Sequence, residues 1–362
     1  MEPLLQPPVK KKRKIDYVAL EKNLRYPLAW AFIVGTLLLN YFFFQKEQIS
    51  LPTEATPVAI YSNQTGDDLH KIVEKSIEKA QKSITIMIFS FNDAPLLDLL
   101  KKKAEAGVKV LIVADAVASQ DLSWKVAPPI EVALHRKKGL MHHKIIVIDG
   151  HSILYGSTNL TPESFIMHAN LLIGVESEKL AQVFEQKALA LKENKSCCDE
   201  PIAIESQKQS LSFYFSPDCH DSLPSLLELI RGAKKSIKVA IYTFTHQELY
   251  HALADAYDRG VDVEVVFDFE QAKQTSKKAL LFLKRKGIKT ALSSRNGLLH
   301  HKFAIIDDSI LATGSANWTK AAFAFNDDLL SIISPLDEVQ KNKIEAVWIK
   351  VKEESKPSYT SK

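Results

Sequence analysis

Cysteine is scarce in this sequence, which contains only Cys197, Cys198 and Cys219. No two of them form a Cys-x-x-Cys pair, so the usual paired-cysteine zinc site is excluded. In an oxidising compartment, Cys197 or Cys198 could form a disulfide with Cys219. Free thiols near a linker are an equally good interpretation, and the sequence leaves both open.

The sequence also lacks a surplus of charge outside its N-terminal region. The formal net charge is +4, and residues 1–45 account for it, with the basic run Lys-Lys-Lys-Arg-Lys at positions 10–14. A domain that holds long nucleic acid usually carries a basic surplus. The neutral remainder therefore disfavours that class of protein and leaves only a local basic groove as a route to nucleic-acid binding.

One long apolar run is present, at residues 28–44, and it contains no charged residue. A membrane-spanning helix needs about 20 apolar residues, with about 17 as the lower limit. No small-x-small cleavage site follows, so we predict a retained signal-anchor over residues 26–45. It would be preceded by a basic tail (1–25) and followed by a linker (46–55). The positive-inside bias places the N-terminus in the cytoplasm and the body on the periplasmic, extracellular or lumenal side.

Two other interpretations apply to this N-terminal region. The apolar run could be a buried core helix, although its position ahead of two complete repeats favours the anchor. The run PVKKKRK also resembles a nuclear import signal. Because it lies next to an apolar span, a role in membrane orientation is the preferred interpretation.

The rest of the chain repeats one pattern of strands and helices. KSITIMIFSF (82–91) aligns with KSIKVAIYTF (235–244), and Asp115 aligns with Asp268 at the same offset. We predict strands at 57–62, 84–91, 108–114, 211–216, 237–244 and 261–267, and helices at 67–82, 94–107, 222–235 and 248–260. The prediction is an α/β fold of two duplicated lobes with mixed sheets flanked by helices. Repeat 1 would cover 56–192, a polar linker 193–209, repeat 2 210–352 and a polar tail 353–362.

Each repeat carries the same string of polar residues. The first string is His142-x-Lys144, Asp149 and Gly156-Ser157-x-Asn159; the second is His300-x-Lys302, Asp307 and Gly314-Ser315-x-Asn317. Two equally spaced copies in equal surroundings indicate one active site built from two half-sites. A histidine, a cation and small polar groups from each half suit attack on a phosphodiester.

The string is typical of a β-hairpin, because Asp149-Gly150 is a strong two-residue turn signal. With that loop, His142 faces Ser157 across the hairpin, and His300 faces Ser315 in the second copy. Because successive side chains along a strand point to opposite faces, histidine, lysine, serine and asparagine then lie on one side of each hairpin. Asp149 and Asp307 point elsewhere, and we expect them to set the turn or hold the strand end.

Most of the other histidines are interpreted as structural. His143 and His301 alternate to the opposite face of the strand, and the same interpretation covers the isolated histidines His70, His135, His151, His168, His220, His246 and His251. A zinc site is disfavoured, because the neighbouring lysine repels a dication and no H-E-x-x-H helix is present. No metal is therefore predicted.

The two strings are similar to the HKD motif, H-x-K-x₄-D-x₆-G-S-x-N, of the phospholipase D superfamily, over roughly residues 56–350. The resemblance implies an active site at the interface of two pseudo-twofold lobes, and chemistry through a phosphohistidine without metal or cofactor. The implied catalytic motif residues are His142, Lys144, Asp149, His300, Lys302 and Asp307. The two lysines, Asn159 and Asn317 would bind phosphoryl oxygens, with Ser157 and Ser315 beside them as further substrate-binding residues.

The resemblance also implies an orienting residue for each histidine. Eleven residues after the motif asparagine, superfamily members often have a carboxylate that orients the histidine; here the two positions are Asn170 and Asp328. We expect Asp328 beside His300, favouring its protonated form, and Asn170 beside His142, leaving it neutral. On this reasoning His142 is the nucleophile and His300 the general acid.

The predicted function is a membrane-anchored phosphodiesterase of the phospholipase D type that hydrolyses a phospholipid, with the bilayer as its partner. The compact repeats look most like the small bacterial nuclease and cardiolipin-hydrolase branch of the superfamily. A membrane-tethered, metal-independent endonuclease acting on nucleic acid is the alternative. A non-catalytic binding protein on the same scaffold is third, because no motif residue is missing. The oligomeric state does not follow from the sequence.

Overall fold

The computed structural model describes residues 30–36, 49–206 and 208–358. The chain divides into two units, residues 1–50 and 51–362. In the first unit, residues 30–36 are helical. The rest of the predicted span at 26–45 lies outside the described residues, as does the basic tail at 1–25. Within the described parts of the chain, no helix is both long and apolar enough to cross a bilayer.

The first lobe is a seven-stranded mixed sheet whose strands are connected in part by helices. Strand order is β1-β7-β6-β5-β2-β3-β4; β2, β3 and β4 are parallel, and the other pairs are antiparallel. Its elements are β1 (Val58–Ser62), η1 (Asn63–Thr65), α2 (Leu69–Lys79), β2 (Ser83–Ile88), α3 (Ala94–Glu105), β3 (Lys109–Asp115), α4 (Leu122–Lys125), β4 (Glu131–His135), β5 (Lys144–Ile148), β6 (Ser152–Gly156), α5 (Pro162–Ile166), β7 (Leu171–Glu176) and α6 (Glu178–Lys192).

The second lobe repeats this plan and adds a strand at each edge. Strand order is β16-β12-β11-β10-β13-β14-β15-β9-β8, with β10, β11 and β12 parallel. Its elements are β8 (Ile202–Ser206), β9 (Gln209–Ser216), α7 (Ser222–Gly232), β10 (Ser236–Ile241), α8 (Gln247–Asp258), β11 (Asp262–Phe267), α9 (Phe269–Lys273), α10 (Lys277–Lys286), β12 (Lys289–Ser293), β13 (Lys302–Ile306), β14 (Ile310–Gly314), α11 (Lys320–Ala324), β15 (Asp328–Ser334), α12 (Glu338–Glu353) and β16 (Ser355–Pro357).

The duplicated α/β fold with mixed sheets is therefore confirmed, whereas two predicted connecting segments contain structure. The segment predicted as a linker at 193–209 contains β8, which pairs with β9. The segment predicted as a polar tail contains β16, which pairs with β12. Both are short edge strands whose few apolar residues give a weak periodic signal.

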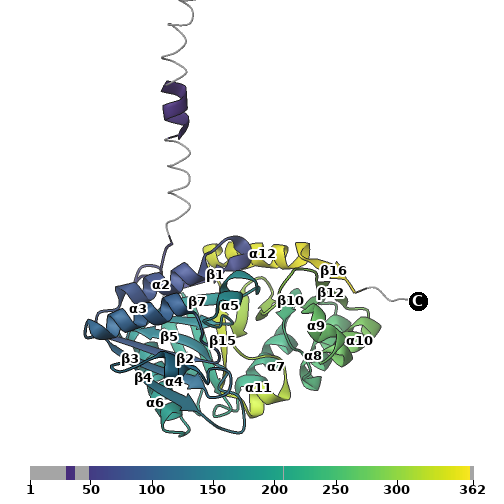
Figure 1. The fold of residues 1–362 in the computed structure, drawn as a ribbon. Helices are drawn as coiled ribbons and strands as arrows, with labels where there is room; N and C mark the ends of the chain where they lie inside the picture. The colour runs from purple at the N-terminus through teal and green to yellow at the C-terminus, as the bar shows by residue number, and fades with distance from the viewer. Residues whose placement is uncertain (1–29, 37–48, 207, 359–362) are drawn as a thin grey trace, which may run out of the picture. The chain divides into compact units, whose positions relative to one another are not determined.

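One hydrophobic core joins the two lobes. Tyr155 and Phe184 of the first lobe pack edge-to-face against Phe213 of the second, with ring centroids 5.6 and 5.5 Å away. Helix α12 contacts β1 and η1 in the first lobe and β10 and β12 in the second (Figure 1). This continuous apolar packing fixes how the two halves of a shared site meet.

The predicted hairpins are present, but their register differs by one residue. Ile148 pairs with Ser152, and Ile306 pairs with Ile310, so each loop has three residues instead of two. Asp149 (φ 52°) and Gly150 (φ 72°) form the expected left-handed turn. His151, and Ser309 in the second hairpin, add a residue before the ladder resumes, so the predicted pairings of His142 with Ser157 and of His300 with Ser315 are wrong.

Candidate active site

The backbone of each motif histidine is bonded to the opposite lobe. His142 precedes β5, and its N–H donates to the carbonyl of Asp327 (2.8 Å). His300 precedes β13, and its N–H donates to the carbonyl of Ala169 (3.0 Å). These two short cross-lobe bridges, Met141 with Asp327 and Leu299 with Ala169, place both histidines at the lobe interface.

Each histidine ring is also oriented by the opposite lobe, which corrects the predicted pairing. Nδ1 of His142 lies 2.8 Å from Oδ1 of Asp328, and Nδ1 of His300 lies 3.0 Å from Oδ1 of Asn170. The expectation that each lobe orients its own histidine is wrong. The reason is that each bridge pairs the segment before a motif histidine with a segment of the opposite lobe. The orienting residue directly follows that second segment.

Ser157 and Ser315 hold the orienting residues, and their contact with substrate stays a prediction. The hydroxyl of Ser157 donates to Oδ1 of Asn170 (2.8 Å), and that of Ser315 donates to Oδ1 of Asp328 (2.7 Å). Each hydroxyl also accepts the N–H of the residue after its partner. Both side chains are buried with their hydrogen bonds made inside the protein.

Asp149 and Asp307 tie the hairpin turns to the sheet, as the hairpin argument predicted, and they lie away from the reacting groups. Asp149 accepts the N–H groups of residues 81–83, and Asp307 those of residues 234–236. Burial alone would raise the pKa of each carboxyl, but the three donors outweigh it and the pKa of both is lowered. Both carboxylates are therefore engaged by backbone donors of their own lobe, and a catalytic role for them stays a prediction.

Lys144 and Lys302 are buried cations in equivalent places. Each Nζ donates to the carbonyl of its own motif histidine, at 2.8 and 2.7 Å, and lies 4.9 Å from the centre of an aromatic ring, Phe89 or Tyr242. Burial lowers the pKa of Lys144 to about 7, against the opposing effect of Asp328. Burial, reinforced by the charge of Lys144, lowers the pKa of Lys302 well below its usual value. Such cations are poorly compensated and suit an incoming phosphate anion.

The two imidazoles are buried, and the charges of both lysines act on each of them. Burial lowers the pKa of His142, Lys144 lowers it further, and Asp328 opposes both. Burial lowers the pKa of His300 well below its usual value, and the charges of Lys302 and Lys144 add to the effect. An anion between the lysines would reverse part of this shift and favour a proton on His300.

The motif asparagines border the site with unequal contacts. Asn159 is half-buried, its N–H donates to Ser164 (2.9 Å), and its Oδ1 is buried with no hydrogen-bond partner among the described residues. Oδ1 of Asn317 accepts the N–H of Thr243 at 3.3 Å. The two side chains thus stand at equivalent positions, and phosphoryl binding through them stays a prediction.

Two aspartates that sequence reasoning left without a role position the motif segments. Asp115 accepts the N–H of Met141 (3.0 Å), and Asp268 accepts the N–H of Leu299 (2.9 Å). Met141 and Leu299 each precede a motif histidine. The equal alignment of these aspartates in the two repeats was the signal that could have revealed this function.

Two glycines were also missed. A Cβ at Gly139 would lie 1.9 Å from the carbonyl oxygen of Phe325, and one at Gly297 would lie 2.3 Å from that of Met167. Both glycines occur three residues before a motif histidine, in the shared string Gly-Leu-x-His-His-Lys. They allow the close backbone contact on which the cross-lobe bridges depend.

The neighbouring histidines divide into core and site residues. His143 and His301 are fully buried, and burial lowers the pKa of each to about 3, so they stay neutral inside the protein. His301 contacts Gln64 (2.6 Å). The ring centroid of His168 lies 6.0 Å from that of His300, so this histidine is next to the site.

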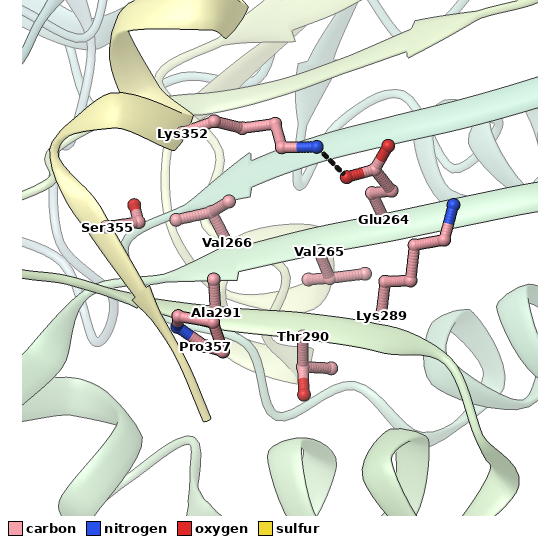
Figure 2. Close-up of a pocket in the computed structure, with 9 residues that line it drawn as sticks. All are labelled: Glu264, Val265, Val266, Lys289, Thr290, Ala291, Lys352, Ser355 and Pro357. Atoms are coloured by element: carbon pink, nitrogen blue, oxygen red, sulfur yellow. Dashed lines mark hydrogen bonds and ion pairs between the residues drawn. The ribbon is translucent and has the colours of Figure 1, made fainter. Parts of the chain in front are cut away.

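A pocket of about 360 Å³ lies elsewhere on the second lobe, between β11, β12 and β16 (Figure 2). Glu264 and Lys352 form an ion pair across it, and none of its lining residues belongs to either motif. We therefore do not assign the chemistry to it. In the described part of the chain, no three histidine, cysteine or acidic side chains cluster as a metal site.

The fold and the paired half-sites define a two-lobe protein of the phospholipase D type. The family model described as "Cardiolipin synthase, PLD-like domain" matches residues 73–191 and 226–348, and the chain belongs to this family within the phospholipase D superfamily. Each matched segment contains one complete motif, so the family assignment and the geometry concern the same residues.

Curated relatives and solved structures are similar to different extents of the chain. The mitochondrial cardiolipin hydrolase of Mus musculus is 31% identical over 134 residues, which are 36% of this chain and 60% of that protein. A probable cardiolipin synthase of Bacillus subtilis is 24% identical over 299 residues, covering 72% and 60%. The phosphatidylserine synthase of Haemophilus influenzae has a TM-score of 0.64 at 12% identity, covering 85% and 88%, which shows the fold alone.

Proposed function

We propose that this protein is a phosphodiesterase that cleaves a phospholipid through a covalent phosphohistidine. The observation that carries the proposal is the pair of buried imidazoles, each held at Nδ1 by the opposite lobe, between two buried lysines. With Nδ1 engaged, Nε2 of each ring is left for the reaction. Nucleophile, acid and cations are then available at one phosphorus without a metal.

In the proposed reaction, Nε2 of His142 attacks phosphorus and the bond from phosphorus to the leaving alcohol breaks. His300 donates its Nε2 proton to that alcohol. The neutral His300 then takes a proton from water as the water oxygen attacks phosphorus, which breaks the bond to His142. Lys144 and Lys302 stabilise the negative charge on the phosphoryl oxygens in both steps.

The roles of the two histidines follow from their different partners. Burial would raise the pKa of Asp328, but His142 and other contacts outweigh it and lower that pKa to about 2, so the carboxylate stays ionised. It stabilises the positive charge that His142 acquires on attack, as the buried aspartate does in a serine-protease triad. Asn170 supplies no such charge, so protonated His300 is the stronger acid. We therefore keep His142 as the proposed nucleophile and His300 as the proposed acid. The reason is now that the carboxylate lies beside the nucleophile, whereas it was expected beside the acid.

A phospholipid substrate is supported by two of the relatives, which are named as a mitochondrial cardiolipin hydrolase and a probable cardiolipin synthase. We propose water as the acceptor. We also propose that residues 26–45 anchor the protein with residues 1–25 in the cytoplasm, and that the repeats at 56–192 and 210–352 form the body on the other side. The apolar run and the basic cluster before it support this placement.

The test is an assay of the full chain, with EDTA present, on phosphatidylcholine, cardiolipin and single-stranded DNA. We expect release of a lipid product and, after acid quenching, a phosphorylated peptide that contains His142. The variant His142→Asn should show neither. DNA cleavage without lipid turnover would contradict the substrate class. Labelling of His300 in place of His142 would reverse the roles, and loss of activity in EDTA would contradict the metal-independent mechanism.

A further inference from the structure

Exposed apolar side chains gather where the two motif segments reach the surface. The set, called here the apolar rim, consists of Val117, Trp124, Leu140, Ile166, Met167 and Phe325. A single exposed apolar residue needs no explanation, but a group of them around a reactive site does. Their positions relative to the histidines follow from backbone contacts.

Leu140 and Phe325 border the first cross-lobe bridge. The N–H of Leu140 donates to Oδ1 of Asn326 (3.1 Å), and the carbonyl of Leu140 accepts the N–H of Asp327 (2.8 Å). The carbonyl of Phe325 lies against Gly139. Both apolar side chains are therefore within three residues of His142 or Asp328, on opposite lobes.

Ile166 and Met167 border the second bridge in the same way. The carbonyl of Met167 accepts a hydrogen bond from Arg295 (3.0 Å) and lies against Gly297, three residues before His300. The third part of the rim is the loop after β3. There Asp115, which holds Met141, also accepts the N–H of Val117 (3.0 Å), and Trp124 follows in α4.

Basic residues accompany the rim. Arg136, Lys137 and Lys138 are exposed and lead directly into Gly139 and Leu140, and Lys125 is next to Trp124. The exposed acidic members of the same segments are Asp121 and Glu163. Apolar side chains flanked by a basic cluster fit the surface of an anionic bilayer, where the apolar groups enter the headgroup boundary and the cations meet lipid phosphates.

We propose that the apolar rim docks the catalytic face of the protein onto an anionic phospholipid bilayer. This inference rests on the proposed function and extends it, because it states how a lipid phosphate reaches buried histidines. Nucleic acid fits less well, since four of the six side chains are aliphatic and cannot stack on bases. A second copy is not needed to complete the site, because one chain already supplies both motif histidines.

The test compares two double variants of the full chain that are matched in exposure. Ile166→Ser with Phe325→Ser changes rim residues that are 78% and 49% exposed; Val339→Ser with Ile349→Ser changes residues of α12 that are 79% and 49% exposed. Amide hydrogen exchange is measured with and without vesicles of phosphatidylglycerol and phosphatidylcholine. We expect vesicles to slow exchange at 117–126, 136–142 and 322–327 by at least about threefold, and not in α12.

The rim variant should lose this protection, and the α12 variant should keep it. Turnover of vesicle lipid relative to a monomeric short-chain phosphatidylglycerol should fall about tenfold in the rim variant only. Absence of protection, protection by single-stranded DNA instead, or protection that depends on protein concentration alone would overturn the docking surface. Protection without turnover of either lipid would contradict the proposed function and still support docking.

Discussion

At the scale of single residues, the asymmetry of the site is decided by one carboxylate and one amide. Asp328 and Asn170 occupy equivalent places, contact the Nδ1 atoms of opposite histidines and each accept a serine hydroxyl. The two half-sites therefore share their geometry and differ in charge. A change of charge at these positions should separate the two catalytic roles.

Asp328→Asn should lower kcat by about 10²–10⁴-fold, because His142 loses the charge that stabilises it as nucleophile. Mass spectrometry of quenched enzyme should show less phosphohistidine than in the wild type. The matched variant Asn170→Asp leaves Asp328 in place and should make the rate depend more strongly on the pKa of the leaving alcohol, since a carboxylate makes His300 a weaker acid. An equal dependence on the pKa of the leaving alcohol in both variants would contradict the assigned roles.

Lys144 should set part of the pH dependence. Its pKa is lowered to about 7 by burial, so its positive charge is present below pH 7 and is lost above it. We expect kcat/KM, which reports the free enzyme, to fall as pH rises through about 7. Lys144→Arg keeps its charge at all these pH values. The activity of this variant should be lower, and its kcat/KM should begin to fall only at a higher pH than in the wild type. If the fall stays at the same pH, another group is responsible for it.

At the scale of elements, the two cross-lobe bridges carry the histidines, and glycine makes each bridge possible. Gly139 and Gly297 bring one backbone against the carbonyl of the other lobe, and Asp115 and Asp268 hold the residue before each histidine. The bridge segments therefore have little room to move. A side chain at either glycine must push the lobes apart or shift a histidine.

Gly139→Ala should lower the free energy of unfolding by about 1–3 kcal/mol, because its Cβ would overlap the carbonyl of Phe325. Activity should fall further than stability accounts for, since His142 follows three residues later. Urea unfolding and kcat measured at a temperature where the variant is folded would check both. Gly232→Ala is the control: no atom lies within 4 Å of its Cβ position, so stability should be unchanged or slightly higher.

At the scale of the whole molecule, a buried ionic cluster joins the lobes beside the site. Lys187 of α6 lies 2.7 Å from Asp218 and 3.6 Å from Asp327, and Asp327 also contacts His135 (3.2 Å). Lys187 is fully buried. Asp327 precedes the orienting Asp328 and bonds to the backbone of His142, so this cluster connects the packing of the lobes to the geometry of the proposed nucleophile.

Lys187→Met should destabilise the protein by about 3–5 kcal/mol, because it leaves two carboxylates buried without their cation. The control on the same helix is Lys192→Met, which removes a largely exposed ion pair with Glu131 and should cost less than about 1 kcal/mol. Thermal unfolding of both variants is the measurement. Equal losses of stability would show that the buried cluster does not hold the lobes together.

Much of the architecture could be predicted from the sequence, because the two repeats are similar enough to be aligned with each other. The strands and helices around Asp115 and Asp268, and both hairpins, follow from apolar periodicity and turn residues. The hairpin register did not follow, because each loop has three residues and apolar periodicity does not encode the length of a loop. The edge strands β8 and β16 were missed because pairing with a neighbour, and not their own composition, makes them strands.

The sequence by itself determined the two motif strings and their hairpins, which carry the proposed reacting groups, since these depend on spacing within a few residues. Only the tertiary structure decided which orienting residue serves which histidine, because His142 and Asp328 are 186 residues apart and meet across the lobe interface. The same holds for the serines, whose hydroxyls face those orienting residues. Local spacing sets which side chains share a strand, whereas packing of one lobe on the other sets which of them touch.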